Sequence, residues 1–282
     1  MSIKTRRAPD RQGPWVRSRR PFLYLLAIAF TLFMLLPLYL ITLSAFSAQS
    51  SIYTFPRSLL PTDLSTDTLA FFLSTEGVLA GARNSVVVAG ITLILSLVIG
   101  APAGYALARY VFKGRSAFQL VILATRSFPI VILAIPLAVM FLDWNIFDTL
   151  QGVALAHTAL ALPTTVLITG SVFVSVPRDL EEAALSLGCT PLGAFRRVSL
   201  PLALPGIAAA ALFTLVLSWN EVFAATILTV SNRTLPAQVL TTLDSSPLPY
   251  RFAGGFALAV PSLLFVFVIR RYLFNLWGQL KP

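Results

Sequence analysis

The hydrophobic positions along this chain gather into six long runs, and most charged residues fall between those runs. A membrane-spanning helix needs about 20 mostly apolar residues to cross a hydrocarbon layer about 30 Å thick. The six runs all approach or exceed that length, and the only charged side chains in them are Arg126 and Glu221. We therefore predict an all-α integral membrane protein with six transmembrane helices, at about residues 22–46, 84–108, 117–142, 152–176, 202–230 and 252–269.

A polar segment, residues 177–201, interrupts this pattern between the fourth and fifth runs. Asp179 and Glu182 have the spacing of a helix N-cap and its capping-box partner. Glu181 and Glu182 would lie in the first turn, where the helix dipole favours negative charge. Gly188 is placed to end this helix, because glycine accepts the left-handed conformation at that position.

A second short helix is predicted after Gly188. Thr190 can cap it, and Pro191 suits the first helical position. Arg196 and Arg197 would then fall near its end, where the dipole favours cations. Local physical chemistry thus predicts two short polar helices with a sharp bend at Gly188.

Composition supports a membrane protein and excludes several other classes. Of the 282 residues, 57% are hydrophobic and 11% are charged, and the mean hydropathy is +0.83. The net charge of +10 does not indicate nucleic-acid binding, because the basic residues cluster at the ends of the apolar runs, where they anchor spans beside lipid. A single cysteine, Cys189, excludes an internal disulfide and a cysteine metal site.

The distribution of Lys and Arg predicts the orientation in the membrane. With the N-terminus inside, sixteen of the 21 Lys and Arg residues lie in inner segments, four lie in outer segments, and Arg126 lies within a span. We expect both termini and residues 177–201 to be cytoplasmic. Residues 1–21 form a basic cytoplasmic tail, and residues 22–282 form a single transmembrane domain.

Two charged residues within spans are candidates for a polar path through the membrane, because charge there is costly and usually faces a cavity or a bundle interior. We expect Glu221, with Trp219 and Asn220 beside it, to line such a path, and these groups suit sugar hydroxyls. The alternative for Glu221 is a structural hydrogen bond to a neighbouring helix. Arg126 would line the path, pair with Glu221 or another polar group, or extend towards the cytoplasm.

Other single residues favour structural roles. His157 is expected to be a satisfied structural histidine near the outer end of the fourth span. Glycines in the spans are expected to permit close helix packing; they are Gly90, Gly100, Gly104 and Gly170.

The polar segment resembles the EAA motif of permeases of ATP-binding-cassette (ABC) importers. The matching pattern is Glu182-Ala183-Ala184, then Gly188, then "VSLP" at 198–201, where the family usually has isoleucine in place of Val198. The resemblance implies that this segment couples the spans to a cytoplasmic ATPase. The implied coupling residues are Glu181, Glu182, Ala183, Ala184, Gly188, Arg196, Arg197, Leu200 and Pro201.

The resemblance extends along most of the chain, through "YALARYVFKGR" (105–115), "FPIVILAIPL" (128–137), "FDTLQGVALAHTALALP" (147–163) and "SWNEVF" (218–223). These stretches are similar to the maltose-type, carbohydrate-importing branch, in its six-span partner subunit. Membership implies a prokaryotic cytoplasmic membrane, a second related permease, an ATPase dimer and an extracytoplasmic solute-binding protein. Uptake would proceed by alternating access. Polyol, glycerol-phosphate and polyamine cargo remain open.

The residues themselves do not predict an enzyme. "GCTPLG" (188–193) has the glycine spacing of a phosphate-binding loop, but Ala194 and Phe195 stand where Lys and Ser or Thr are required. We expect this chain to bind no cofactor, with ATP and Mg²⁺ held by the partner ATPase. An ion-coupled secondary transporter gives no reason for the polar segment, and a membrane scaffold leaves Arg126 and Glu221 unexplained.

Overall fold

The structure is a computed structural model that describes residues 14–56, 58–61 and 63–278, and helices dominate this part of the chain. The helices are α1 (Pro14–Ala45), α2 (Gln49–Ile52), α3 (Asp67–Ser74), α4 (Val78–Arg109), α5 (Arg115–Thr125), α6 (Ile130–Asp143), α7 (Leu150–Ser175), α8 (Arg178–Ser186), α9 (Pro191–Ala194), the π-helix η1 (Phe195–Ser199), α10 (Leu200–Asn220), α11 (Phe223–Leu228), α12 (Leu235–Thr242) and α13 (Leu248–Gly278).

The all-helical membrane fold is confirmed, with corrections to two of the six runs. Five stretches are single helices long and apolar enough to cross a membrane. The third run instead forms α5 and α6, which are bent by 93° at the break between them. The fifth run ends early, because α10 stops at Asn220 and the chain resumes as the short helix α11.

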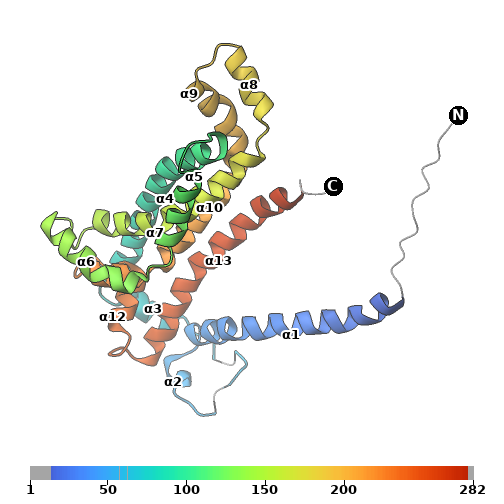
Figure 1. The fold of residues 1–282 in the computed structure, drawn as a ribbon. Helices are drawn as coiled ribbons and strands as arrows, with labels where there is room; N and C mark the ends of the chain where they lie inside the picture. Colours follow the sequence, from blue (N-terminus) through green and yellow to red (C-terminus); the bar gives the residue numbers. More distant parts are fainter. Residues whose placement is uncertain (1–13, 57, 62, 279–282) are drawn as a thin grey trace.

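The helices place the polar segment and the segments that contain α2, α3 and α12 at opposite ends of the molecule. α8 and α9 lie at one end of the bundle, and α2, α3 and α12 lie at the other (Figure 1). α4, α7 and α10 pack against one another and connect the two ends. α1 extends away from the bundle and packs near its C-terminal end against α13, where Leu43 and Ala45 are buried.

Close contact between α4 and α7 forms the centre of the bundle. A Cβ added at Gly100 would lie 2.7 Å from Thr165 Cγ2, and one added at Gly104 would lie 2.6 Å from Gly170 N. Thr169 uses this proximity to donate a hydrogen bond to the Gly100 carbonyl oxygen (3.0 Å). The predicted packing role is therefore confirmed for Gly100, Gly104 and Gly170. It is wrong for Gly90, because an added Cβ there would meet nothing within 4 Å.

A carboxylate ties two loops together at the end of the bundle opposite α8. Asp148, in the α6–α7 loop, accepts backbone N–H groups of Val230 (2.8 Å), Ser231 (3.0 Å) and Asn232 (3.0 Å) through one oxygen. Burial alone would raise the pKa of Asp148, but these donors favour the charged form and hold the pKa below its usual value. The α11–α12 loop is thereby fixed to the start of α7.

The α4–α7 contact yields a matched pair of substitutions. Gly104→Ala should lower the free energy of unfolding by about 1–3 kcal/mol, because the new methyl group overpacks a closed interface. Gly90→Ala changes a glycine on the same helix that faces open space. It should lower the free energy of unfolding by no more than a few tenths of the amount expected for Gly104→Ala. Thermal unfolding of the purified protein in detergent measures both. Equal stabilities of the two variants would contradict the close packing.

Candidate functional site

The polar segment folds as two helices around a left-handed glycine. α8 ends at Ser186, and Gly188 follows with φ +88°. Thr190 then accepts the backbone N–H of Gly193 (3.1 Å), and Pro191 occupies the first turn of α9. The bend at Gly188, the threonine cap and the proline start are all confirmed.

Three local details of the segment differ from expectation. The N-cap of α8 is Pro177 and no side chain caps it, so the predicted Asp179–Glu182 capping box is wrong. Asp179 lies inside the first turn instead, where the helix dipole still favours it. The second helix is also not separate, because α9, η1 and α10 follow one another without a break. Arg196 and Arg197 lie exposed in the π-helical turn that joins them.

The Glu181 carboxylate lies inward, against α4 and η1. It accepts hydrogen bonds from Arg109 Nε (3.0 Å), from Ser199 Oγ (2.8 Å) and from the Tyr105 hydroxyl. The Arg109 and Glu181 side chains are only 6% and 13% exposed, so this ion pair is largely withdrawn from water. We call these four residues the Glu181 cluster. The cluster joins α8 to the end of α4 and to the start of the long helix that contains α10.

Two arginines reinforce this junction through main-chain carbonyls. Arg109 Nη2 donates to the Val176 oxygen (2.9 Å), and Arg178 Nη2 donates to the Ala108 oxygen (3.3 Å). Both acceptors lie at helix ends, where carbonyls lack partners within the helix. The corner between α7 and α8 is thus fixed to the last turn of α4.

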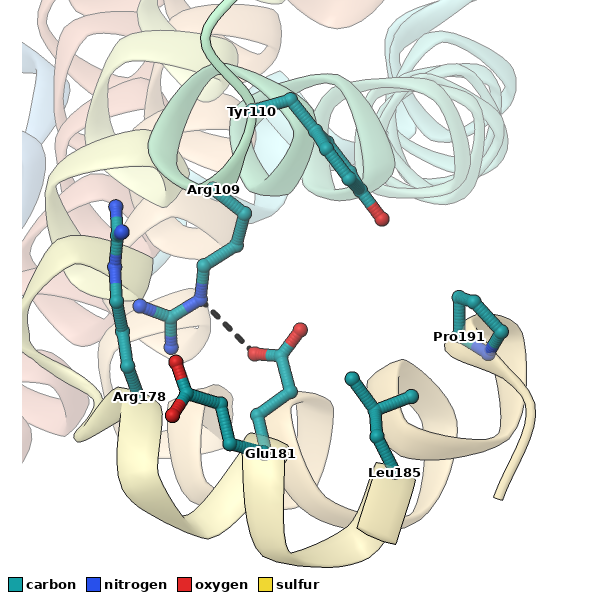
Figure 2. Close-up of a pocket in the computed structure, with 7 residues that line it drawn as sticks. Arg109, Tyr110, Arg178, Glu181, Leu185 and Pro191 are labelled. Carbon is teal, nitrogen blue, oxygen red and sulfur yellow. Dashed lines mark hydrogen bonds and ion pairs between the residues drawn. The ribbon is translucent and has the colours of Figure 1, made fainter. Parts of the chain in front are cut away.

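A pocket of about 270 Å³ opens beside the cluster. Figure 2 shows Arg109 and Glu181 pointing towards each other, with Tyr110 on one side of the pocket and Leu185 and Pro191 on the other. Glu182 also lines this pocket. Its side chain is exposed, and its carboxylate makes no hydrogen bond with the described residues.

The remaining predicted coupling residues divide between the interior and the surface. Ala184 is buried and Leu200 is half-buried, whereas Ala183, Gly188 and Pro201 are exposed. Leu187, at the tip of the bend, is 87% exposed, which is a large apolar side chain left open to water or to a partner. The exposed tip and the exposed Glu182 form the outward surface of the segment.

Glu221 lies at the break between α10 and α11 and is bound within the protein. Its two oxygens accept the backbone N–H groups of Ala224 (3.0 Å) and Ala225 (3.1 Å), which begin α11. His157 Nε2 lies 3.1 Å from the same carboxylate, and His157 Nδ1 lies 2.9 Å from Ser218 Oγ. His157 is fully buried, so the expected structural histidine is confirmed.

The neighbours of Glu221 face different surroundings. Trp219 is buried and donates from Nε1 to the Leu258 oxygen (3.1 Å), so its ring packs α10 against α13 rather than opening onto a path. Asn220 is exposed and accepts a hydrogen bond from Ser262 on α13 (3.2 Å). Of the three path residues predicted in this stretch, Trp219, Asn220 and Glu221, only Asn220 is exposed in this conformation.

Arg126 lies at the α5–α6 bend and is exposed, with no ion-pair partner among the described residues. Of the alternatives for Arg126, the pair with Glu221 is wrong, because Glu221 is paired with His157. Arg126 lines a cavity of about 210 Å³ with residues of α7 and α10, including Thr164 and Thr214. The Arg126 guanidinium, threonine hydroxyl groups and apolar side chains thus line one cavity, between the α5–α6 bend and the helices α7 and α10.

The sequence did not predict the hydrogen-bond partners of Glu181 and Glu221. Tyr105, Arg109 and Ser199 carried no signal as a group, because they lie up to 94 residues apart in sequence. The i, i+4 spacing of Tyr105 and Arg109 does place them on one face of a helix, which was the only local hint. The break after Asn220 likewise has no proline or glycine to predict it.

Residues 96–276 match the family described as binding-protein-dependent transport system inner membrane component. The trehalose transport system permease protein SugB of Mycobacterium tuberculosis is 34% identical over 194 residues, covering 67% of this chain and 71% of that protein. The probable ABC transporter permease protein YurM of Bacillus subtilis is 30% identical over 257 residues, covering 89% and 82%. The diacetylchitobiose uptake system permease protein NgcG of Streptomyces coelicolor is 34% identical over 196 residues, covering 70% and 65%.

Solved structures share the fold. A chain of a bacterial ABC transporter that imports the acidic polysaccharide alginate superposes with a TM-score of 0.71 at 22% identity, covering 91% of this chain and 98% of that one. A chain of the methionine ABC transporter MetNI gives a TM-score of 0.60 at 22% identity, covering 69% and 93%. At these sequence identities the superpositions show a shared fold and nothing more.

The α10–α11 break yields a stability prediction. Glu221→Gln should lower the free energy of unfolding by about 2 kcal/mol, because an amide cannot replace both acceptor oxygens of the carboxylate. His157→Ala should also destabilise, and the double variant should lose less than the sum of the two, since they share one interaction. Thermal unfolding in detergent measures all three, with Glu182→Gln, at an exposed carboxylate that makes no hydrogen bond with the described residues, as the control. Full additivity would contradict the pairing.

Proposed function

Since the chain belongs to the family of binding-protein-dependent transport system inner membrane components, we propose that it is the membrane-spanning permease subunit of an ATP-driven importer of a sugar or oligosaccharide. Relatives named for trehalose, diacetylchitobiose and arabinooligosaccharide transport support this substrate class. Polyol, glycerol-phosphate and polyamine cargo are the competing classes. Uptake of radiolabelled members of each class by the reconstituted complex tests the choice.

The observation that carries this proposal is the outward surface of the coupling segment. α8 and α9 project from the end of the bundle (Figure 1), with Leu187 at the tip of the bend and with Glu182 making no ion pair with the described residues. A charged group beside an exposed apolar anchor is the composition of a docking site for a soluble protein. An ion-coupled secondary transporter has no use for such a surface.

The partner at this surface is an ATPase dimer, which binds ATP and Mg²⁺ and closes on them. The remaining partners are a second, related permease, which completes the translocation path, and a solute-binding protein at the opposite face. Transport proceeds by alternating access, with the coupling segment carrying the motion of the ATPase to the spans. Arg126 and Asn220, both exposed, are the path residues that this chain contributes.

Orientation follows from the Lys and Arg distribution, which puts both termini and α8 in the cytoplasm. In a Cys189→Ser background, cysteines at Ser2 and Ser186 should resist an impermeant thiol reagent in intact cells and react after permeabilisation. A cysteine at the exposed Ser245, in the loop between α12 and α13, is the positive control and should react in intact cells. Labelling of Ser186→Cys without permeabilisation would reverse the orientation.

The bend of the coupling segment yields a functional prediction. Gly188→Val should strain a backbone at φ +88° by about 1–2 kcal/mol and place a branched side chain where the ATPase docks. The protein should reach the membrane, but uptake and the stimulation of ATP hydrolysis by substrate-loaded binding protein should fall. Glu182→Lys should act similarly by reversing the charge of the docking surface.

Gly114→Val is the matched control for strain. Gly114 has φ +90° and, like Gly188, has open space where a Cβ would be added, but it lies in another loop. Gly114→Val should cause the same backbone strain, but substrate-loaded binding protein should still stimulate ATP hydrolysis. Normal stimulation and uptake in Gly188→Val would remove the coupling role from this segment.

A further inference from the structure

We propose that the Glu181 cluster transmits the motion of the docked ATPase to α4, while the neighbouring Glu182 serves docking. The inference rests on the proposed function and divides the polar segment into an outward part and an inward part. Glu181 is then a positioning residue, which acts through Tyr105, Arg109 and Ser199 rather than on the ATPase itself.

The two adjacent glutamates differ in burial and in partners. Successive residues of an α-helix are rotated by about 100°, and although both side chains line the same pocket, only Glu181 is largely withdrawn from water. Glu181 is 13% exposed and bound to three donors. Glu182 is exposed and lines the pocket without a hydrogen-bond partner among the described residues. The Glu181 carboxylate is therefore bound inside the protein, and the Glu182 carboxylate is accessible to a cation on a partner.

The cluster is built to resist separation. Arg109 and Glu181 form a largely buried ion pair, and removing one partner of such a pair leaves an uncompensated charge away from water. The rings of Tyr105, Phe173 and Phe195 pack around it, with centroids 4.6–5.9 Å apart. A displacement of α8 must consequently move the end of α4 with it or break several interactions at once.

α4 carries such a displacement into the bundle. Its glycines at 100 and 104 hold it against α7, and Thr169 binds the Gly100 oxygen. α7 is joined in turn to α10 by the Thr165–Thr214 hydrogen bond (3.0 Å). Thr214 lines the cavity that contains Arg126. A continuous set of close contacts thus connects Glu181 to a wall of the proposed path.

The test compares Glu181→Gln with Glu182→Gln in the complete importer, reconstituted in liposomes with its binding protein. Glu181→Gln should retain the ATPase through purification, but the ratio of stimulated to unstimulated ATP hydrolysis should fall about tenfold, the effect of losing one charge-assisted hydrogen bond. Glu182→Gln should instead reduce the amount of ATPase that co-purifies. A merely structural role of Glu181 would lower both quantities together.

Tyr105→Phe provides a milder second variant, because it removes one hydroxyl and keeps the ring packing. It should lower the stimulation ratio about threefold with ATPase content unchanged. Normal stimulation in both Glu181→Gln and Tyr105→Phe, or loss of the ATPase from either, overturns the inference. Absence of stimulation in the wild-type complex would overturn the proposed function instead, so the two failures are distinguishable.

Discussion

An ionised carboxylate that leaves water needs hydrogen-bond donors, and in this chain that need joins segments far apart in sequence. Glu181 binds α8 to α4, Glu221 binds the start of α11 to α7, and Asp148 binds the α6–α7 loop to the α11–α12 loop. Each tie lies where a helix begins or ends. The long apolar helices pack through small residues. Where these helices begin or end, carboxylates hold the neighbouring segments together.

The sequence predicted those features of the polar segment that depend on a few consecutive residues. Gly188, Thr190 and Pro191 each act through their own backbone conformation or through a hydrogen bond to a residue three positions away, so the bend and the second helix start could be read directly. Length and hydropathy likewise located the spans, apart from the bend in the third run and the early end of the fifth. The capping box failed because Pro177 is the N-cap residue that precedes α8, which left Asp179 two residues beyond the N-cap position.

The chemistry of the candidate site depends on tertiary partners, and these could not be predicted. Nothing in the order of residues shows that Glu181 is bound inside the protein, because the facing arginine lies 72 residues away. Glu221 looked like a path residue for a sound reason, since intramembrane charge is costly, but His157 and two backbone N–H groups meet that cost. The α5–α6 bend had a local signal in Pro129, whose preceding residue is disfavoured in a helix.

The continuous helical run from Pro191 to Asn220 can move as one long element. Thirty helical residues span about 45 Å, so a rotation of about 10° around the midpoint moves each end by about 4 Å in opposite directions. One end begins beside the bend at Gly188, and the other stops at the break before Glu221. A displacement of one end of this helix would therefore reach the other end with its direction reversed.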